Sequence, residues 1–310
     1  MGQLLKIIGW FALVSLLWWG GARFLLPPPE DARATLELIL TKEEIARQIE
    51  PPRVVILGGS SSRYGFSAEQ LSAATGLRAV NLGTHAGLGG RYLLDRAKQN
   101  LRAGDLAIIA LEPGFYIRED LSVVTARFVQ FATPGYLFRA PAWQWPQMIF
   151  GVSPHDLLRS YALVAFVGDT PNTVGAQGDE MGSGVENVTD YYRALVERSA
   201  ALRRPLVTVE NMPDYLREFI GWAHNNGVAL RAAWPVVFYR PEYESEAYAA
   251  SFASITETFE SLGVPVLGSQ LDFALPLELM FDTAYHANSN GRTAATEALI
   301  HAITEATPAN

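Results

Sequence analysis

The feature that most constrains the fold is a set of three short apolar runs, at Arg53–Leu57, Arg78–Leu82 and Asp105–Leu111. Their side chains lack the polar alternation of a half-exposed strand, so each run predicts a strand buried on both faces. Further strands are expected at Val228–Val237 and Val264–Leu267. Helical segments separate these runs, and one begins at Ser67, where Gln70 completes the spacing of a capping box. The alternation predicts an α/β fold with a parallel sheet flanked by helices.

A long apolar stretch, Leu4–Leu26, precedes the first predicted strand and contains no charged residue between Ile7 and Ala22. About 20 apolar residues cross roughly 30 Å of hydrocarbon, so residues 4–26 are predicted to be a transmembrane anchor. A cleaved signal peptide is the alternative. The short head with Lys6 favours a cytoplasmic N-terminus, which places the rest of the chain in the periplasm or outside the cell.

The remaining chain divides into a linker and one large domain. Residues 27–52 are predicted to hold a stiff proline spacer and an amphipathic stalk helix, and residues 53–310 to form the α/β domain. Within that domain, residues 115–201 are rich in aromatic side chains and are expected to be a helical insertion with its own small core. A lid or a partner-docking surface is the functional alternative. The stretch Gly175–Gly184 is expected to be a mobile loop.

Composition excludes several classes of function. The net charge is −8 and no basic block occurs, which argues against a nucleic-acid partner. The chain has no cysteine, so thiolate chemistry and disulfides are absent. The histidines lack ligand spacing and the glycines lack a dinucleotide fingerprint, so neither a metal nor a cofactor is predicted.

Residue types suited to acyl transfer gather where the predicted strands end. Gly58–Gly65 follows the first strand, Asn81–Gly87 follows the second, and Asp282–Asn288 precedes the last helix. Ligands of open parallel sheets bind at the carboxyl ends of the strands. A serine hydroxyl becomes a good nucleophile when an imidazole takes its proton and a carboxylate orients that imidazole.

Two of these segments resemble the blocks of SGNH/GDSL hydrolases. The strand with Gly58–Gly65 is similar to the first block of that superfamily, and Phe281–His286 with Gly291 is similar to its terminal Asp-x-x-His block. The anchor and the Gly-Ser-Ser form look most like the membrane-tethered branch, which includes alginate O-acetylation proteins and the D-alanine-transfer protein of teichoic acids. The resemblance implies a three-layer, flavodoxin-like domain.

The resemblance also implies roles for single residues. Alignment on Gly59 and Gly65 keeps the four-residue step from the serine to the glycine and makes Ser61 the predicted nucleophile. Alignment on Gly58 makes Ser60 the alternative. His286 would be the base and Asp282 its orienting carboxylate, although the histidine follows the aspartate by four residues instead of three.

The oxyanion donors would be the N–H groups of Ser61 and Gly87, with Gly83 as the rival to Gly87. The block Gly-x-Asn-Asp is missing, and Leu111–Gly114 stands in its place. Loss of one oxyanion donor costs about 10²–10³ in rate.

These features predict a membrane-anchored serine O-acyltransferase or esterase. By resemblance it would acetylate a surface or secreted polysaccharide, and it would work with an acyl donor or a membrane-bound O-acyltransferase partner. The alternative is a non-catalytic scaffold, or a carbohydrate-binding accessory of such an acyltransferase. The missing block and the altered Asp–His spacing favour this alternative.

Overall fold

The structure is a computed structural model that describes residues 2–116, 119, 121–167, 173–200 and 212–306. It divides into two compact units, which are described separately. The first consists of Met1–Glu37 with Leu121–Asn172, and the second of Leu38–Asp120 with Thr173–Asn310.

The helices are α1 (Gly2–Leu25), α2 (Glu30–Gln48), α3 (Ser60–Gly65), α4 (Ala68–Thr75), α5 (Gly90–Ala97), α6 (Val123–Phe131), α7 (Trp145–Phe150), α8 (Pro154–Val167), α9 (Asp190–Ala200), α10 (Asp214–Asn225), α11 (Glu246–Ser261) and α12 (Ser289–Ala306). The strands are β1 (Arg53–Leu57), β2 (Arg78–Asn81), β3 (Leu106–Ile109), β4 (Ala229–Ala233), β5 (Val237–Phe238), β6 (Val266–Leu267) and β7 (Ala274–Leu275).

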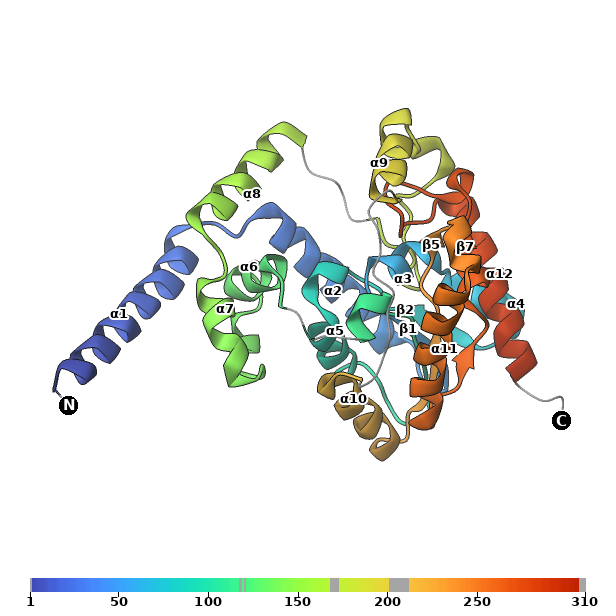
Figure 1. Ribbon diagram of the computed structural model, residues 1–310, viewed down its shortest axis with the longest axis horizontal. Helices are drawn as coiled ribbons and strands as arrows, with labels where there is room; N and C mark the ends of the chain where they lie inside the picture. The colour runs from blue at the N-terminus through green and yellow to red at the C-terminus, as the bar shows by residue number, and fades with distance from the viewer. Residues whose placement is uncertain (1, 117–118, 120, 168–172, 201–211, 307–310) are drawn as a thin grey trace. The chain divides into compact units, whose positions relative to one another are not determined.

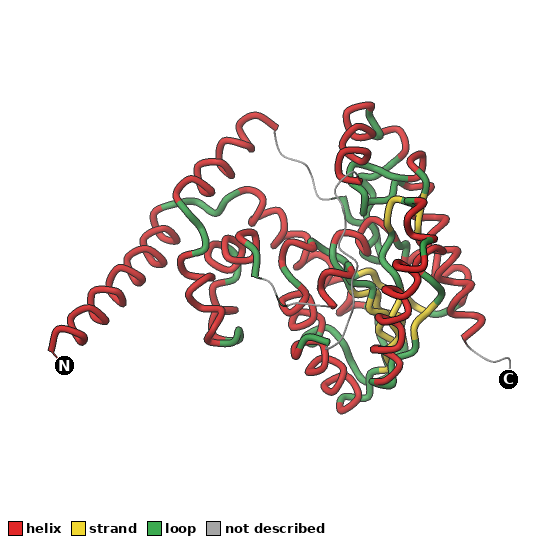
Figure 2. The backbone as a smooth tube through the Cα atoms, viewed as in Figure 1, coloured by secondary structure: helices red, strands yellow, loops and turns green. Residues whose placement is uncertain are grey.

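The second unit is built on a five-stranded parallel sheet in the order β2-β1-β3-β4-β6. All five residues of β1 are buried, as a strand covered on both faces requires. Helices α5 and α10 cover one face, and α4 and α12 cover the other (Figure 1). Figure 2 shows the strands enclosed by these helices. The predicted parallel α/β sheet is therefore confirmed.

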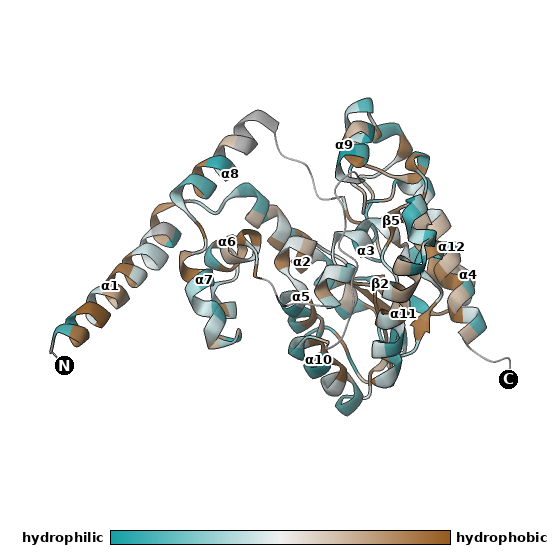
Figure 3. Ribbon diagram, in the orientation of Figure 1, coloured by the Kyte–Doolittle hydropathy of each residue, from teal (hydrophilic) through white to brown (hydrophobic). Residues whose placement is uncertain are grey.

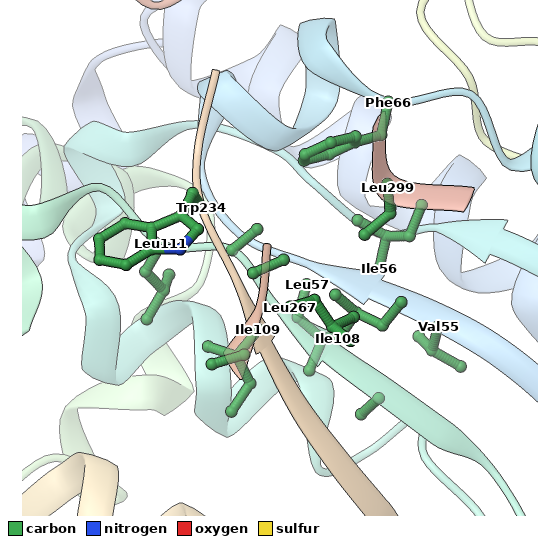
Figure 4. Packing of buried hydrophobic residues seen from close by; sticks show 14 of the residues in the cluster. Val55, Ile56, Leu57, Phe66, Ile108, Ile109, Leu111, Trp234, Leu267 and Leu299 are labelled. Carbon is green, nitrogen blue, oxygen red and sulfur yellow. The ribbon is translucent and has the colours of Figure 1, made fainter. Parts of the chain in front are cut away.

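Aliphatic side chains from the central strands form the core of this unit. Val55, Ile56 and Ile108 are completely buried, and Figure 4 shows them in one cluster with Leu267 of β6 and Leu299 of α12. At the end of the core, Arg53 forms a buried ion pair with Asp105, at 3.0 Å between Nε and Oδ1. The arginine also donates to the backbone carbonyl of Asn100, so the buried charge is well hydrogen-bonded.

Local sequence patterns predicted most strands of the sheet at the positions where the structure has them. The helix start predicted at Ser67 is confirmed, because its hydroxyl accepts from the Gln70 N–H at 3.1 Å and α4 begins at the next residue. The reciprocal bond of a capping box is not formed, since the Ser67 N–H donates to the Thr296 hydroxyl at 2.9 Å. The single strand expected at Val228–Val237 is instead divided into β4 and β5. Strand β5 leaves the main sheet and pairs in parallel with β7.

Residues 173–184, which we call the acidic segment, are fixed in place instead of forming the expected loose loop. Asp179 and Glu180 are each 3% exposed. The Asp179 carboxylate accepts from the Ser67 hydroxyl at 2.6 Å and from the Ala68 N–H at 2.7 Å, so it stabilises the start of α4. Glu180 forms an ion pair with Arg63 of α3. The acidic segment therefore belongs to the α/β unit.

The first unit joins α1 to α6, α7 and α8. Helix α1 is long and apolar enough to cross a membrane, and hydrophobic residues occur along its length (Figure 3). We call residues 121–167 the aromatic segment. Its core is formed by Ala126, Phe131, Val152 and Leu157, against which Trp18 of α1 packs. The insertion expected at 115–201 is thus divided between the units, and residues 117–118, 120, 168–172 and 201 lie outside the described residues.

Candidate functional site

The turn after β1 places three serines at the start of α3. Only glycine fits at position 58, because a Cβ there would lie 2.1 Å from the Ser62 Oγ. A Cβ at Gly59 would lie 2.7 Å from both carboxylate oxygens of Glu112. The two glycines therefore let the chain leave the sheet and enter the helix within two residues.

Ser61 faces the interior. It is completely buried, its hydroxyl donates to the Val236 carbonyl at 2.8 Å, and its N–H donates to Glu112 at 3.1 Å. Ser62 is buried as well and donates to the Ala110 carbonyl. Both side chains attach α3 to neighbouring parts of the α/β unit.

Ser60 differs from both of these serines. It is the first residue of α3 and is only partly buried. Within the described residues, no hydrogen bond holds its hydroxyl. Residues four apart lie on the same face of a helix, so Ser60 shares its face with Tyr64.

The predicted aspartate and histidine are hydrogen-bonded to each other. The His286 Nδ1 lies 2.6 Å from Oδ1 of Asp282, and both side chains are partly buried. The loop closes on itself, because the Phe281 N–H donates to the His286 carbonyl at 2.7 Å. The spacing of four residues therefore suits a closed turn that brings the two side chains together.

Tyr64 joins this loop to the serine helix. Its ring stacks on the imidazole of His286, with centroids 4.2 Å apart and planes 16° from parallel. The Arg63 guanidinium lies 5.0 Å from the centroid of the Tyr64 ring. Burial raises the pKa of Tyr64 to about 12, so the phenol stays protonated at neutral pH. The sequence analysis missed this residue, although the four-residue step from Ser60 to Tyr64 was a readable signal.

The amides predicted to bind an oxyanion are engaged by side chains. Gly87 donates to Nδ1 of His85 at 2.9 Å, and Gly83 donates to Oδ1 of Asn81 at 2.8 Å. The N–H of Ser61 donates to Glu112, as described above. The three N–H groups predicted to bind an oxyanion therefore all donate to side chains of the protein.

Asn81 and Glu112 complete the surroundings of the serine turn. The Asn81 amide donates to the carbonyls of Ser62 and Phe66, at 3.0 and 2.8 Å, and thereby fixes the end of α3. Glu112 follows β3, at the place of the missing Gly-x-Asn-Asp block, and its carboxylate lies against Gly59. This part of the site therefore presents a carboxylate where the resemblance led us to expect an asparagine amide.

A buried lysine lies behind the turn. Lys42 is 1% exposed, and its Nζ donates to the Gly83 carbonyl at 2.6 Å. It lines a cavity with Leu57, Gly58 and Tyr92. Burial lowers the pKa of Lys42 from 10.5 to about 7. Within the described residues, no group of three or more His, Asp or Glu side chains is placed to hold a metal ion.

Comparison with known proteins identifies no family. No protein-family model and no curated protein matches the chain. Among solved structures, the chain is similar to the crystal structure of protein YxiM from Bacillus subtilis, with 10% sequence identity and a TM-score of 0.39. The match covers 84% of this chain and spans 58% of that one. A likeness of this degree carries no argument about what the chain does.

Proposed function

We propose that this chain is a membrane-anchored serine acyltransferase or esterase of the SGNH type. Ser60 is the nucleophile, His286 the general base and Asp282 the carboxylate that orients the base. The observation that carries the proposal is the hydrogen bond between Asp282 and His286. The His286 ring stacks on Tyr64, which belongs to the helix that begins at Ser60.

The geometry supports a specific role for each of the three residues. A carboxylate only accepts hydrogen bonds, so the Nδ1 of His286 carries a proton and donates its hydrogen bond to Asp282. The lone pair of Nε2 is then available to take the proton of the serine hydroxyl. Ser60 suits this role better than Ser61, because the Ser61 hydroxyl donates to Val236 from a completely buried position. The serine oxygen attacks the acyl carbonyl and forms a serine ester as the bond to the leaving group breaks, and the imidazolium gives its proton to that leaving group. The acceptor hydroxyl, or water in an esterase, then loses its proton to His286 and attacks the ester, and the serine recovers its proton as the acyl group is transferred.

The resemblance to membrane-tethered SGNH proteins supports the choice of substrate and location. The acyl group is acetyl, and the acceptor is a hydroxyl of a surface or secreted polysaccharide. Helix α1 anchors the chain with its N-terminus in the cytoplasm and the α/β unit outside, beside a membrane-bound O-acyltransferase or another acyl donor. No metal or cofactor takes part in the proposed reaction.

Turnover of an activated acetyl ester by the full-length protein in detergent micelles tests the proposal. We expect Ser60→Ala and His286→Ala each to lower kcat by about 10³ or more, and the double variant to be no slower than either. Asp282→Asn should lower kcat by a factor on the order of 10³–10⁴. Ser61→Ala is the matched control, and it should keep most of the activity. Loss of activity in Ser61→Ala but not in Ser60→Ala would assign the nucleophile to Ser61.

The role of the anchor is tested separately. Tethering by a short linker raises the effective concentration of a partner to about the millimolar range. Replacing residues 1–32 with a cleavable export signal should therefore spare ester turnover but abolish polymer modification in cells. Intact mass spectrometry of the native protein provides a direct check, because a mature N-terminus at Arg23 or beyond would exclude the anchor.

A non-catalytic role is the second candidate, and one observation favours it. All three amides predicted to stabilise an oxyanion are engaged by Asn81, His85 and Glu112. A scaffold or carbohydrate-binding accessory of a membrane acyltransferase needs no such donors. If wild type, Ser60→Ala and Ser61→Ala turn over the ester equally slowly while wild type binds the acceptor oligosaccharide in calorimetry, this candidate replaces the first.

A further inference from the structure

The aromatic segment packs along the candidate membrane helix. The ring of Phe150 in α7 lies 5.3 Å from that of Phe11 in α1, centroid to centroid. Trp18 contacts the small core of the segment, and the Arg23 guanidinium donates to the Gln130 carbonyl at 3.5 Å. The Tyr161 hydroxyl donates to the carbonyl of Pro27. These contacts follow α1 from its middle to its C-terminal end.

The positions of these contacts determine how far the segment reaches. Phe11 precedes Arg23 by about 18 Å along the axis of α1, at 1.5 Å per residue. The hydrocarbon core of a bilayer is about 30 Å thick. If α1 crosses the bilayer with Arg23 at one interface, Phe150 contacts α1 inside the hydrocarbon core, about 18 Å from that interface. The aromatic segment is then drawn into the lipid together with α1.

The outer surface of the segment suits an apolar environment. Phe138 is 80% exposed, Leu158 70% and Trp143 61%, and Trp145 and Phe150 are also exposed. A single exposed apolar side chain is ordinary, but several on one small unit indicate a surface that meets lipid or protein. Tryptophan, with its apolar ring and polar N–H, is enriched where a membrane meets water.

The charge of the segment indicates which of these partners fits. Residues 121–167 carry three arginines and one aspartate, although the whole chain has a net charge of −8. Arg139 and Arg159 are exposed. Basic side chains beside exposed aromatic rings are attracted to anionic lipid headgroups.

We propose that the aromatic segment is a second membrane-binding element, which enters one leaflet beside α1 and exposes its aromatic side chains to lipid. This inference rests on the part of the proposed function that places α1 in a membrane, but it does not depend on acyl transfer. Its consequence is that the chain is held by two elements, so its attachment resists rotation and tilting more than a single helix would allow.

Spin labels on single cysteines test the proposal, because the natural chain contains no cysteine. Full-length Phe138→Cys, Trp143→Cys and Leu158→Cys would be labelled and placed in nanodiscs of phosphatidylcholine with phosphatidylglycerol. Leu16→Cys in α1 serves as the lipid reference. Leu271→Cys, on an exposed side chain of the α/β unit, serves as the water reference. The readout is the accessibility of each label to oxygen relative to a water-soluble nickel chelate.

We expect the three test labels to show an oxygen-to-nickel ratio several-fold above that of Leu271→Cys, approaching that of Leu16→Cys. Test labels that match Leu271→Cys while Leu16→Cys is lipid-immersed would overturn the proposal and leave the anchor intact. A water-accessible Leu16→Cys label would reject the anchor itself. Labels shielded from both reagents would show that protein covers the segment, and lipid would then be the wrong partner.

Discussion

Lys42 provides a quantitative test of the environment behind the serine turn. Its folded-state pKa is lowered to about 7, first by burial and then by the positive charge of Arg63. Arg292 of α12 also lowers this pKa, whereas Glu180 and Asp179 of the acidic segment raise it. In the unfolded chain the same ammonium group titrates near pH 10.4. The lysine is therefore neutral in the folded state over a range of pH in which the unfolded chain is charged.

The direction of the effect follows from proton binding. Between about pH 7 and pH 10 the unfolded state binds one proton more than the folded state, so the free energy of unfolding rises with pH. A single group contributes at most about 1.4 kcal/mol per pH unit. The expected gain from pH 7.5 to pH 9 is about 2 kcal/mol. Well below pH 7 the lysine is protonated in both states, so it no longer makes the free energy of unfolding depend on pH.

Urea unfolding of the full-length protein in detergent micelles, followed by circular dichroism, measures this slope. Lys42→Met keeps the apolar stem but removes the titrating amine, so its free energy of unfolding should lack the 2 kcal/mol rise. The difference between the two proteins is the relevant quantity, because all other groups titrate in both. A difference that stays constant from pH 7.5 to pH 9 would refute the lowered pKa.

Three further predictions concern stability, measured in the same way. Asp105→Asn should destabilise the fold by about 3–5 kcal/mol, because it leaves the buried Arg53 charge uncompensated. Gly291→Ala should cost about 1–3 kcal/mol, because its Cβ would lie 2.1 Å from the Leu279 carbonyl oxygen. Gly221→Ala, with open space around its Cβ within α10, should instead stabilise the protein by about 0.5–1 kcal/mol. A loss in Gly221→Ala as large as that in Gly291→Ala would contradict the steric explanation.

Much of the sheet could be predicted from the sequence because its signals are local. The run Arg53–Leu57 is rich in β-branched residues and lacks the polar alternation of a half-exposed strand, as expected of a strand covered on both faces, and β1 occupies the same residues. The cap at Ser67 was readable because both partners lie within one helical turn. The hydrogen bond between Asp282 and His286 also joins residues of one loop.

The parts that could not be predicted depend on partners distant in the sequence. The orientation of Ser61 follows from a carbonyl at Val236, which no local pattern reveals. The acidic segment resembles a loose loop until Asp179 is seen at the start of α4 and Glu180 beside Arg63. The two-unit division likewise follows from contacts between α1 and residues more than a hundred positions later.

The acidic segment also affects how the sheet can associate. Strand β2 lies at one edge of the sheet, and exposed edges can pair with strands of other molecules. Here the Asn81 N–H donates to the Gln177 carbonyl at 2.9 Å, and Gly178 lies so close to the Asn81 carbonyl that a Cβ would be 2.5 Å from its oxygen. A strand from a second copy would have to displace Gln177 before it could pair with Asn81. The segment thus protects this end of the edge from aggregation by strand addition.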